Sequence, residues 1–407
     1  MKRLILGLIC LPMSVFGQVS MEDFLWSALE APEVQTLMQQ NAFLETNSYK
    51  LSPIRGMEIR TETNQLDPHR QDFALRINPA NPWEIKRNNE YFQTYQEVIG
   101  LDQDRKLKEL LTRHYAAIIG WSYLQEQKKL KQEEQEITQS LLQILEAQRF
   151  SSFFDADDYA DLKIDLLEKH ADLEELNFEE EILRKEIESL FPLAKSQDIA
   201  WSMASLVPVE LIEQWIQRHE ARPENGEIAY RQKLVELASA EWALAKSNLN
   251  IGFVQAQYQQ YRLEQERSPW SIGLGVRLPL FNPNKGKMAE KKLDILEAQG
   301  ELTQAQDEQE AGLSLMKTKV RTLTQRYHSL QEQMESLDME GLGENLNAIQ
   351  GGNPLAELRL RRSLVKSKNV TARLKRDIYH AYIEYLAETE LLQSLPMVNY
   401  LQSDSLR

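Results

Sequence analysis

Residues 270–288, WSIGLGVRLPLFNPNKGKM, contain both kinds of secondary structure from which the whole chain is built. The first part alternates large apolar residues with serine, glycine and arginine, which is the period of a β-strand with one apolar face. Pro279 and Pro283 end this strand, and Lys285 begins a long polar stretch with the spacing of a helix. The alternating apolar residues are Trp270, Ile272, Leu274, Val276 and Leu278.

The helix that follows carries an uninterrupted coiled-coil seam, in which apolar residues are separated alternately by three and four positions. The seam residues are Leu313, Met316, Val320, Leu323, Tyr327, Leu330, Met334 and Leu337. Because this pattern recurs in four predicted helices, we expect a bundle or cylinder of long antiparallel helices. The longest predicted helix, over residues 83–149, would be roughly 100 Å long at ~1.5 Å per residue.

The order of elements occurs twice. INPANPWEIKRN, at residues 77–88, follows a first strand pair in the way that LPLFNPNKGKMA, at residues 278–289, follows a second. Each repeat is predicted to contain a helix, a strand pair, a long helix, a tip turn and another helix. The predicted divisions are a first repeat at 18–192, an equatorial linker region at 193–225, a second repeat at 226–394 and a C-terminal tail at 395–407. The predicted strands are 57–65, 70–78, 251–262 and 270–280, and the tip turns lie near 150–156 and 338–354.

Residues 1–17 have the three regions of a secretory signal peptide: Lys2 and Arg3, an apolar segment, and a cleavage site before Gln18. Cys10, the single cysteine, lies inside this segment, so we expect no disulfide, reactive thiolate or cysteine metal site in the mature chain. No later run of apolar residues has the ~18 positions of a membrane-spanning helix. The sequence therefore predicts export to the periplasm, to the exterior or into an outer membrane.

The strands fit an outer-membrane β-barrel in length, at ~9–11 residues each, and in their apolar-out, polar-in alternation. A half-buried sheet in a soluble protein has the same period and is the alternative. Four strands cannot close a barrel, and open strand edges are not tolerated in lipid, so several copies would have to pool their strands. The five apolar residues from Trp270 to Leu278 are then predicted to face the membrane. The residues predicted to face the lumen are Glu58, Arg60, Arg76 and Arg277.

Composition argues against several classes of function. The chain has 62 acidic and 47 basic residues, a net charge of −15, which disfavours a nucleic acid as partner. The six histidines include no pair at metal-ligand spacing, and no acid pair stands out, so we predict no metal, no cofactor and no enzyme activity. The histidines at 114, 170, 328 and 380 fall on predicted helices, where we expect solvated faces.

Four stretches resemble TolC-type outer-membrane efflux proteins. SIGLGVRLPLFNPNKGKMAEKK is similar to the second-repeat strand and helix entry of that family, and NGEIAYRQKLVELASAEWALAKSN to the preceding helix. GGNPLAELRLRRSLVKSKN resembles the turn and helix at the periplasmic tip, and SMEDFLWSALEAPEVQTLMQQN the N-terminal helix pair. The chain departs from the family in its short length, in Asn248-Leu249-Asn250 where a proline is common, and in residues 193–225, which carry no family signature.

This resemblance implies a mainly α fold with β: long coiled-coil helices forming an α-barrel, and four strands per chain in a trimeric, twelve-stranded transmembrane β-barrel. It implies an outer-membrane location extending into the periplasm, contact with outer-membrane lipid, and two partners, a periplasmic adaptor and an inner-membrane transporter. The implied function is the passive exit duct of a tripartite efflux or type I secretion system. A soluble periplasmic coiled-coil adaptor or chaperone is the alternative, and a surface structural or adhesive protein is a third possibility.

Two groups of residues are candidates for function at the tip. The first, predicted to line a cation-favouring pore aperture, comprises Asp155, Asp157, Asp158, Glu340 and Glu344. N-capping of a helix is the alternative for Asp155. The second, which the family resemblance implies as an adaptor-binding tip, comprises Gly351, Gly352, Asn353 and Leu355. For Gly352 a helix C-cap is an alternative role that is compatible with adaptor binding.

Overall fold

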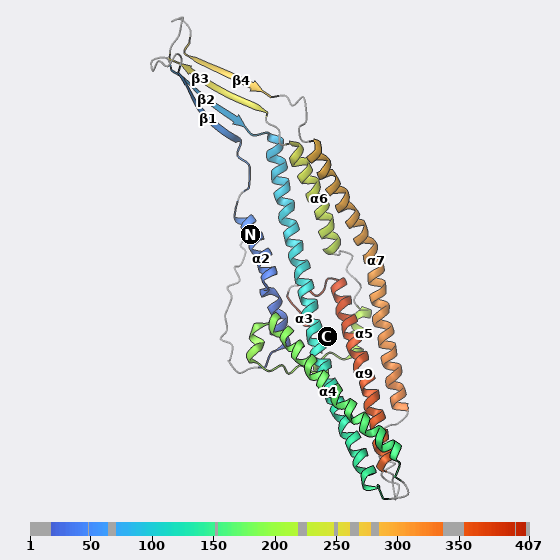
Figure 1. The fold of residues 1–407 in the computed structure, drawn as a ribbon. Coiled ribbons are helices and arrows are strands. Elements are labelled where there is room, and N and C mark those ends of the chain that lie inside the picture. Colours follow the sequence, from blue (N-terminus) through green and yellow to red (C-terminus); the bar gives the residue numbers. More distant parts are fainter. Residues whose placement is uncertain are drawn as a thin grey trace. The chain divides into compact units, whose positions relative to one another are not determined.

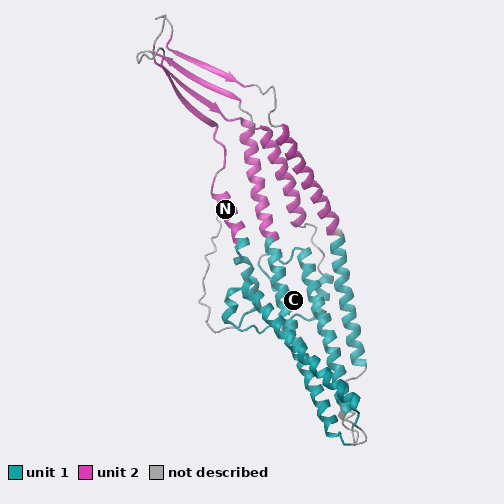
Figure 2. Cartoon of the chain, in the orientation of Figure 1, with its two compact units in different colours: residues 1–34, 106–223, 310–407 teal, residues 35–105, 224–309 magenta. Residues whose placement is uncertain are grey.

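The structure is a computed structural model in which most residues are helical and one sheet is present (Figure 1). It describes residues 18–47, 49–63, 71–150, 154–218, 226–247, 251–260, 268–277, 285–336, 354–394 and 396–403. The chain forms two compact units (Figure 2). Unit 1 comprises residues 1–34, 106–223 and 310–407, and unit 2 comprises residues 35–105 and 224–309. In the described part of the chain, no helix combines the length and apolarity needed to cross a membrane.

The helices and strands follow the predicted order. The elements of the N-terminal half are α1 (Met21–Trp26), η1 (Ser27–Glu30), α2 (Pro32–Thr46), β1 (Ile54–Thr63), β2 (Gln71–Pro79), α3 (Pro82–Ala147) and α4 (Ala156–Leu190). The middle of the chain contains η3 (Pro192–Ser196), η4 (Met203–Ser205) and α5 (Val209–Arg218). The C-terminal half contains α6 (Gly226–Ser247), β3 (Gly252–Gln259), β4 (Trp270–Val276), α7 (Lys285–Ser336) and α9 (Pro354–Glu388).

Element boundaries differ from the predictions mainly at strand ends. β1 begins at Ile54 rather than at residue 57, because pairing with β2 continues through a register irregularity between Ile54 and Gly56. β3 stops at Gln259 and β4 at Val276, short of residues 262 and 280. The signal segment at 1–17 and the second tip turn lie outside the described residues.

The sheet of unit 2 has the order β1-β2-β3-β4, and every neighbouring pair is antiparallel. The central pairing, β2 with β3, joins strands from the two predicted repeats and aligns Leu75 with Ala256. Gly252 has φ of +126°, and a Cβ there would lie 1.8 Å from the carbonyl oxygen of Gly275. Only glycine fits this start of β3, because any side chain would collide with the backbone of β4.

Unit 1 contains a hydrophobic cluster contributed by α3, α4 and α9. Its buried members are Leu130, Ile137, Leu141, Leu142, Leu145, Leu162, Val365 and Ala372. The predicted seam of α7 also faces inward: Val320 and Tyr327 are buried, and the other described seam residues are half-buried. Coiled-coil spacing therefore located the packed face of this helix correctly.

Residues 193–218, the described part of the predicted linker region 193–225, contain short helices that join a second core in unit 1. Trp215 packs edge-on against both Tyr382 of α9 and Tyr400. The backbone N–H of Val207 donates to the carbonyl of Leu401, a residue of the predicted C-terminal tail that is fully buried. Both stretches are therefore structural parts of unit 1.

His114 is the clearest departure from the sequence expectations. We expected it on a solvated helix face, but its side chain is only 1% exposed. Its Nδ1 lies 2.7 Å from the carbonyl oxygen of Leu110, its Nε2 lies 3.2 Å from Oγ of Ser27, and its ring packs against Phe24. The prediction was wrong because the N-terminal segment covers this face of α3, a long-range contact that helical periodicity does not reveal.

This burial predicts a pH dependence of stability. Desolvation lowers the pKa of His114 and that of His380 below the usual 6.5, so the folded state resists protonation. As the pH falls below about 6.5, the unfolded chain takes up protons that the folded chain does not. The free energy of unfolding should then decrease by up to about 1.4 kcal/mol per pH unit for each group.

Denaturant titrations between neutral pH and pH ~5 would measure this slope. The variant His114→Gln should have a shallower slope than the wild type. The matched control is His170→Gln, since His170 is exposed on α4 and should leave the slope unchanged. Equal slopes in the wild type and His114→Gln would contradict the prediction.

Candidate functional site

The sheet of unit 2 has one continuous apolar face. The register aligns Met57 with Ile77, Ile77 with Val254, and Val254 with Leu274, so these four side chains project from the same side. Nine large apolar side chains on this face are 38–79% exposed: Met57, Ile59, Phe73, Leu75, Val254, Trp270, Ile272, Leu274 and Val276. An exposed patch of this extent is typical of a surface that contacts another apolar phase or partner.

The opposite face of the sheet is polar. Glu58 lies opposite Arg76 in the register, and Arg60 forms a salt bridge of 2.6 Å with Glu58. The guanidinium of Arg76 donates two hydrogen bonds, of 2.9 and 3.1 Å, to Oε1 of Gln255. These contacts satisfy the charged groups across three strands, so this face is built for a polar environment.

Of the two glycines on this face of β4, Gly275 has a structural cause, whereas a Cβ at Gly273 would meet nothing within 4 Å. The ring of Phe253 lies over Gly275, where a Cβ would come within 2.3 Å of the ring. The guanidinium of Arg76 in turn stacks 4.1 Å from the centre of the Phe253 ring. Gly275 therefore leaves room for the Phe253 ring, and the Arg76 guanidinium lies over that ring.

Polar contacts fix the junction between strands and helices in unit 2. Arg55, near the start of β1, forms an ion pair with the buried Glu84 in the first turn of α3. The side chain of Asn81 accepts a hydrogen bond from the N–H of Trp83 and donates one of 2.9 Å to the carbonyl of Ser247, at the end of α6. The strand pair and the helix after it are thereby held in a defined local geometry.

At the tip of unit 1, Asp155 is the N-cap of α4. Its Oδ1 accepts hydrogen bonds from the N–H groups of Asp157 and Asp158, at 3.0 and 3.2 Å. Asp158 also receives a hydrogen bond of 2.5 Å from the guanidinium of Arg359 on α9. Of the acids predicted for a pore aperture, Asp155 thus caps α4 and Asp158 links α4 to α9.

A buried ion network connects the same helices further along. Glu134 of α3 is 3% exposed and lies 3.3 Å from Nζ of Lys131 and 3.5 Å from Nζ of Lys169. Lys169 of α4 also lies 3.3 Å from Asp165, and Asp165 forms an ion pair of 2.7 Å with Arg362 of α9. The network ties α3, α4 and α9 together with groups that would be costly to leave unpaired.

The structure brings some of the predicted site residues together. Glu58, Arg60 and Arg76 share the polar face, and Arg277 follows the end of β4 with an exposed side chain. Leu355, predicted for adaptor binding, packs against the hydrophobic cluster of unit 1. The predicted site residues outside the described part of the chain are Glu340, Glu344, Gly351, Gly352, Asn353 and Leu278. Among the described residues, no group of three or more acids and histidines could hold a metal ion.

Solved structures of other proteins resemble this chain, although sequence comparisons find no match. No family model and no curated protein matches the sequence. The outer membrane protein VceC of Vibrio cholerae is similar, with a TM-score of 0.67 and 12% identity over 91% of this chain and 96% of that chain. The MtrE outer membrane channel of Neisseria gonorrhoeae has a TM-score of 0.64 and 12% identity over 95% and 90%. The chain has a TolC-type fold.

A third structure of this TolC-type fold, the CmeC outer membrane channel of Campylobacter jejuni, has a TM-score of 0.65 and 10% identity over 91% of this chain and 85% of that chain. The TM-scores show that these structures share the fold, and the low identities show that most side chains differ. The resemblance first noted in short motifs therefore extends to the whole architecture of helices and sheet.

Sequence reasoning missed the basic partners of two acids of α4. Arg359 and Arg362 pair with Asp158 and Asp165, although neither arginine was singled out. A signal was present: eight basic and no acidic residues occur from Arg359 to Arg376, whereas α4 is rich in acids. Such complementary charge blocks on two long helices indicate that the helices lie against each other.

Proposed function

We propose that this protein is an outer-membrane channel, the passive exit duct of a tripartite efflux or type I secretion system. The observation that carries the proposal is the sheet, with its continuous exposed apolar face and its hydrogen-bonded polar face. A transmembrane barrel needs this division, because lipid surrounds its outside and water fills its lumen. The likeness in fold to VceC and MtrE, an outer membrane protein and an outer membrane channel, supports the same function.

The proposal requires several copies of the chain. Four strands have two edges, and unpaired backbone groups at those edges are not stable in lipid. Three copies would supply twelve strands, enough for a closed barrel. We therefore propose a homotrimer in which the exposed apolar residues of β1 to β4 face lipid, and Glu58, Arg60, Arg76 and Arg277 face the lumen.

A second apolar surface, on α4 in unit 1, supports self-association. Ile164, Leu167, Phe178 and Ile182 are each more than half exposed. Leu167 and Phe178 are eleven residues apart, about three helical turns, so they project from the same side of α4. A stripe of this kind on a long helix is typical of a coiled-coil contact with a partner helix.

The oligomeric mass of the detergent-extracted protein tests this proposal. We expect a stable trimer that is recovered from the outer-membrane fraction only with detergent. A monomer or dimer that dissolves without detergent would overturn the duct and favour a periplasmic coiled-coil adaptor or chaperone.

The tip of unit 1 is proposed as the periplasmic aperture. Around a threefold axis, Asp155, Asp157 and Asp158 would form acidic rings, which favour cations in channels. The proposal extends to Glu340 and Glu344 in the second tip turn. Contact with a periplasmic adaptor, bound to an inner-membrane transporter, is proposed at Gly351, Gly352, Asn353 and Leu355.

Neutralising the tip acids should lower cation selectivity. The triple replacement of Asp155, Asp157 and Asp158 by alanine is expected to reduce the cation-to-anion permeability ratio several-fold in planar bilayer recordings. Glu168→Ala, an exposed acid further along α4, is the control and should leave the ratio unchanged.

Asp155→Asn separates charge from capping, since asparagine caps helices as well as aspartate does. It should lower selectivity while keeping the thermal stability of the wild type. Unchanged selectivity in the triple variant would remove these acids from the aperture.

A further inference from the structure

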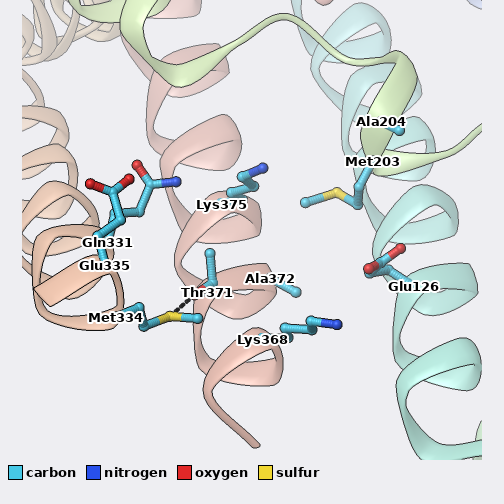
Figure 3. A pocket seen from close by; sticks show the side chains of 10 residues that line it. All are labelled: Glu126, Met203, Ala204, Gln331, Met334, Glu335, Lys368, Thr371, Ala372 and Lys375. Atoms are coloured by element: carbon cyan, nitrogen blue, oxygen red, sulfur yellow. Dashed lines mark hydrogen bonds between the residues drawn. The ribbon is translucent and has the colours of Figure 1, made fainter. Parts of the chain in front are cut away.

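A cavity of about 350 Å³ in unit 1 has no role in the proposed duct. It lies between α3, η4, α7 and α9, and Figure 3 shows the ten side chains that line it. Its volume is within the range of pockets that hold small organic molecules. The chemistry of its lining indicates which class of molecule would fit.

One face of α9 supplies two cations to this cavity. Lys368, Thr371, Ala372 and Lys375 line it, and their spacing of three, four and seven residues places them on the same side of the helix. In the described part of the chain, neither lysine lies within ion-pair distance of a carboxylate. By contrast, the arginines at 359, 362 and 376 of the same helix each have an acidic partner.

The surroundings of Lys375 leave its ammonium able to bind a ligand. Its Nζ lies 5.7 Å from the centre of the Tyr327 ring, a cation–π contact that uses none of its N–H donors. Thr371 donates its own hydroxyl hydrogen towards Ser367 or Met334. Its hydroxyl oxygen can therefore only accept, and the N–H donors for an anion come from the two lysines.

The remaining lining is apolar on one side and acidic at its margins. Met203 and Ala372 are buried, and Met334 is half-buried, so they offer thioether and methyl surface to an apolar body. In Figure 3 the two lysines extend towards the space bordered by Met203 and Glu126, whereas Glu335 lies beside Gln331 on α7. Glu126 would repel a second negative charge on a ligand.

We propose that this cavity binds a small organic monoanion, such as an aromatic carboxylate or sulfonate, with its charged group between Lys368 and Lys375. The apolar body of the ligand packs against Met203, Met334 and Ala372. The charge of α9 favours an anion here, because all eight charged residues from Arg359 to Arg376 are basic, in a chain of net charge −15. None of the lining residues is among those proposed for the pore aperture, the adaptor-binding tip or the barrel lumen.

Para-bromobenzoate is a suitable probe, titrated calorimetrically into the full-length, detergent-extracted protein against a detergent-matched blank. We expect saturable binding, and no binding of the neutral para-bromobenzamide. Lys368→Gln and Lys375→Gln should each weaken binding by about tenfold or more, the effect of losing one charged hydrogen bond. Lys375→Arg should retain binding.

Lys366→Gln is the matched control, because Lys366 is an exposed lysine of α9 that does not line the cavity. It should bind the probe as the wild type does. The proposal is overturned if the wild type does not bind the carboxylate, if the amide binds equally well, or if the three glutamine variants have equal affinity. Melting curves of all variants would establish that each is folded.

Discussion

Replacing Ile272 by arginine is expected to abolish most membrane assembly. Ile272 lies in the middle of β4 and is 79% exposed on the apolar face of the sheet. In the proposed barrel its side chain meets the hydrocarbon core, where an arginine costs ~2–4 kcal/mol in each copy. A trimer contains the substitution three times, so the fraction of protein recovered from the outer membrane as a detergent-stable oligomer should fall sharply.

Ser271→Arg is the matched control. Ser271 is the neighbouring residue of β4, and its register with Gln257 places it on the polar face. An arginine there would face the lumen, so assembly should remain close to that of the wild type. Equal losses in the two variants would contradict the assignment of the two faces, and a greater loss for Ser271→Arg would reverse it.

Glu134→Ala is expected to destabilise the helical part of unit 1 by about 3 kcal/mol. The substitution leaves the ammonium of Lys169, whose side chain is only 11% exposed, without one of its two acidic neighbours. Removing one member of a buried ion pair typically costs 3–5 kcal/mol, and the remaining contact with Asp165 favours the lower value. Loss of the far-ultraviolet helical signal with denaturant would measure the change.

Two further variants make this prediction specific. Glu136→Ala removes an exposed acid two residues away on α3 and should change stability by less than about 0.5 kcal/mol. The double variant Glu134→Leu, Lys169→Met replaces both charges with apolar side chains and should recover most of the loss. If the double variant were less stable than Glu134→Ala, the cost would come from packing rather than from the unpaired charge.

Periodicity accounts for what the sequence predicted well. The seam from Leu313 to Met334 has the inward-facing pattern expected of a coiled coil, because a helix can bury only residues that recur every three to four positions. Alternation in β4 likewise identified the apolar residues that the sheet displays. Both patterns depend only on residues close together in the sequence, and each repeats several times, so one deviating residue does not change the prediction.

Contacts between distant segments were not predictable in this way. Arg359 and Asp158 are 201 residues apart in the sequence, and His114 is covered by Phe24 and Ser27. Charge and burial at these positions depend on which helices become neighbours. The acid-rich α4 and the basic segment of α9 indicated such a pairing in general, but not which residues meet.

The sequence by itself determined the order of elements, the coiled-coil faces of the helices and the apolar side of the strands, because these follow from the fixed geometry of helix and strand. Only the tertiary structure decided that β2 pairs with β3 and so unites the strand pairs in one sheet. It alone also showed that residues 193–218 and the segment around Leu401 form part of a core, and that an ion network ties α3, α4 and α9 together. Those features depend on packing between residues far apart in the chain, for which a single sequence contains no periodic signal.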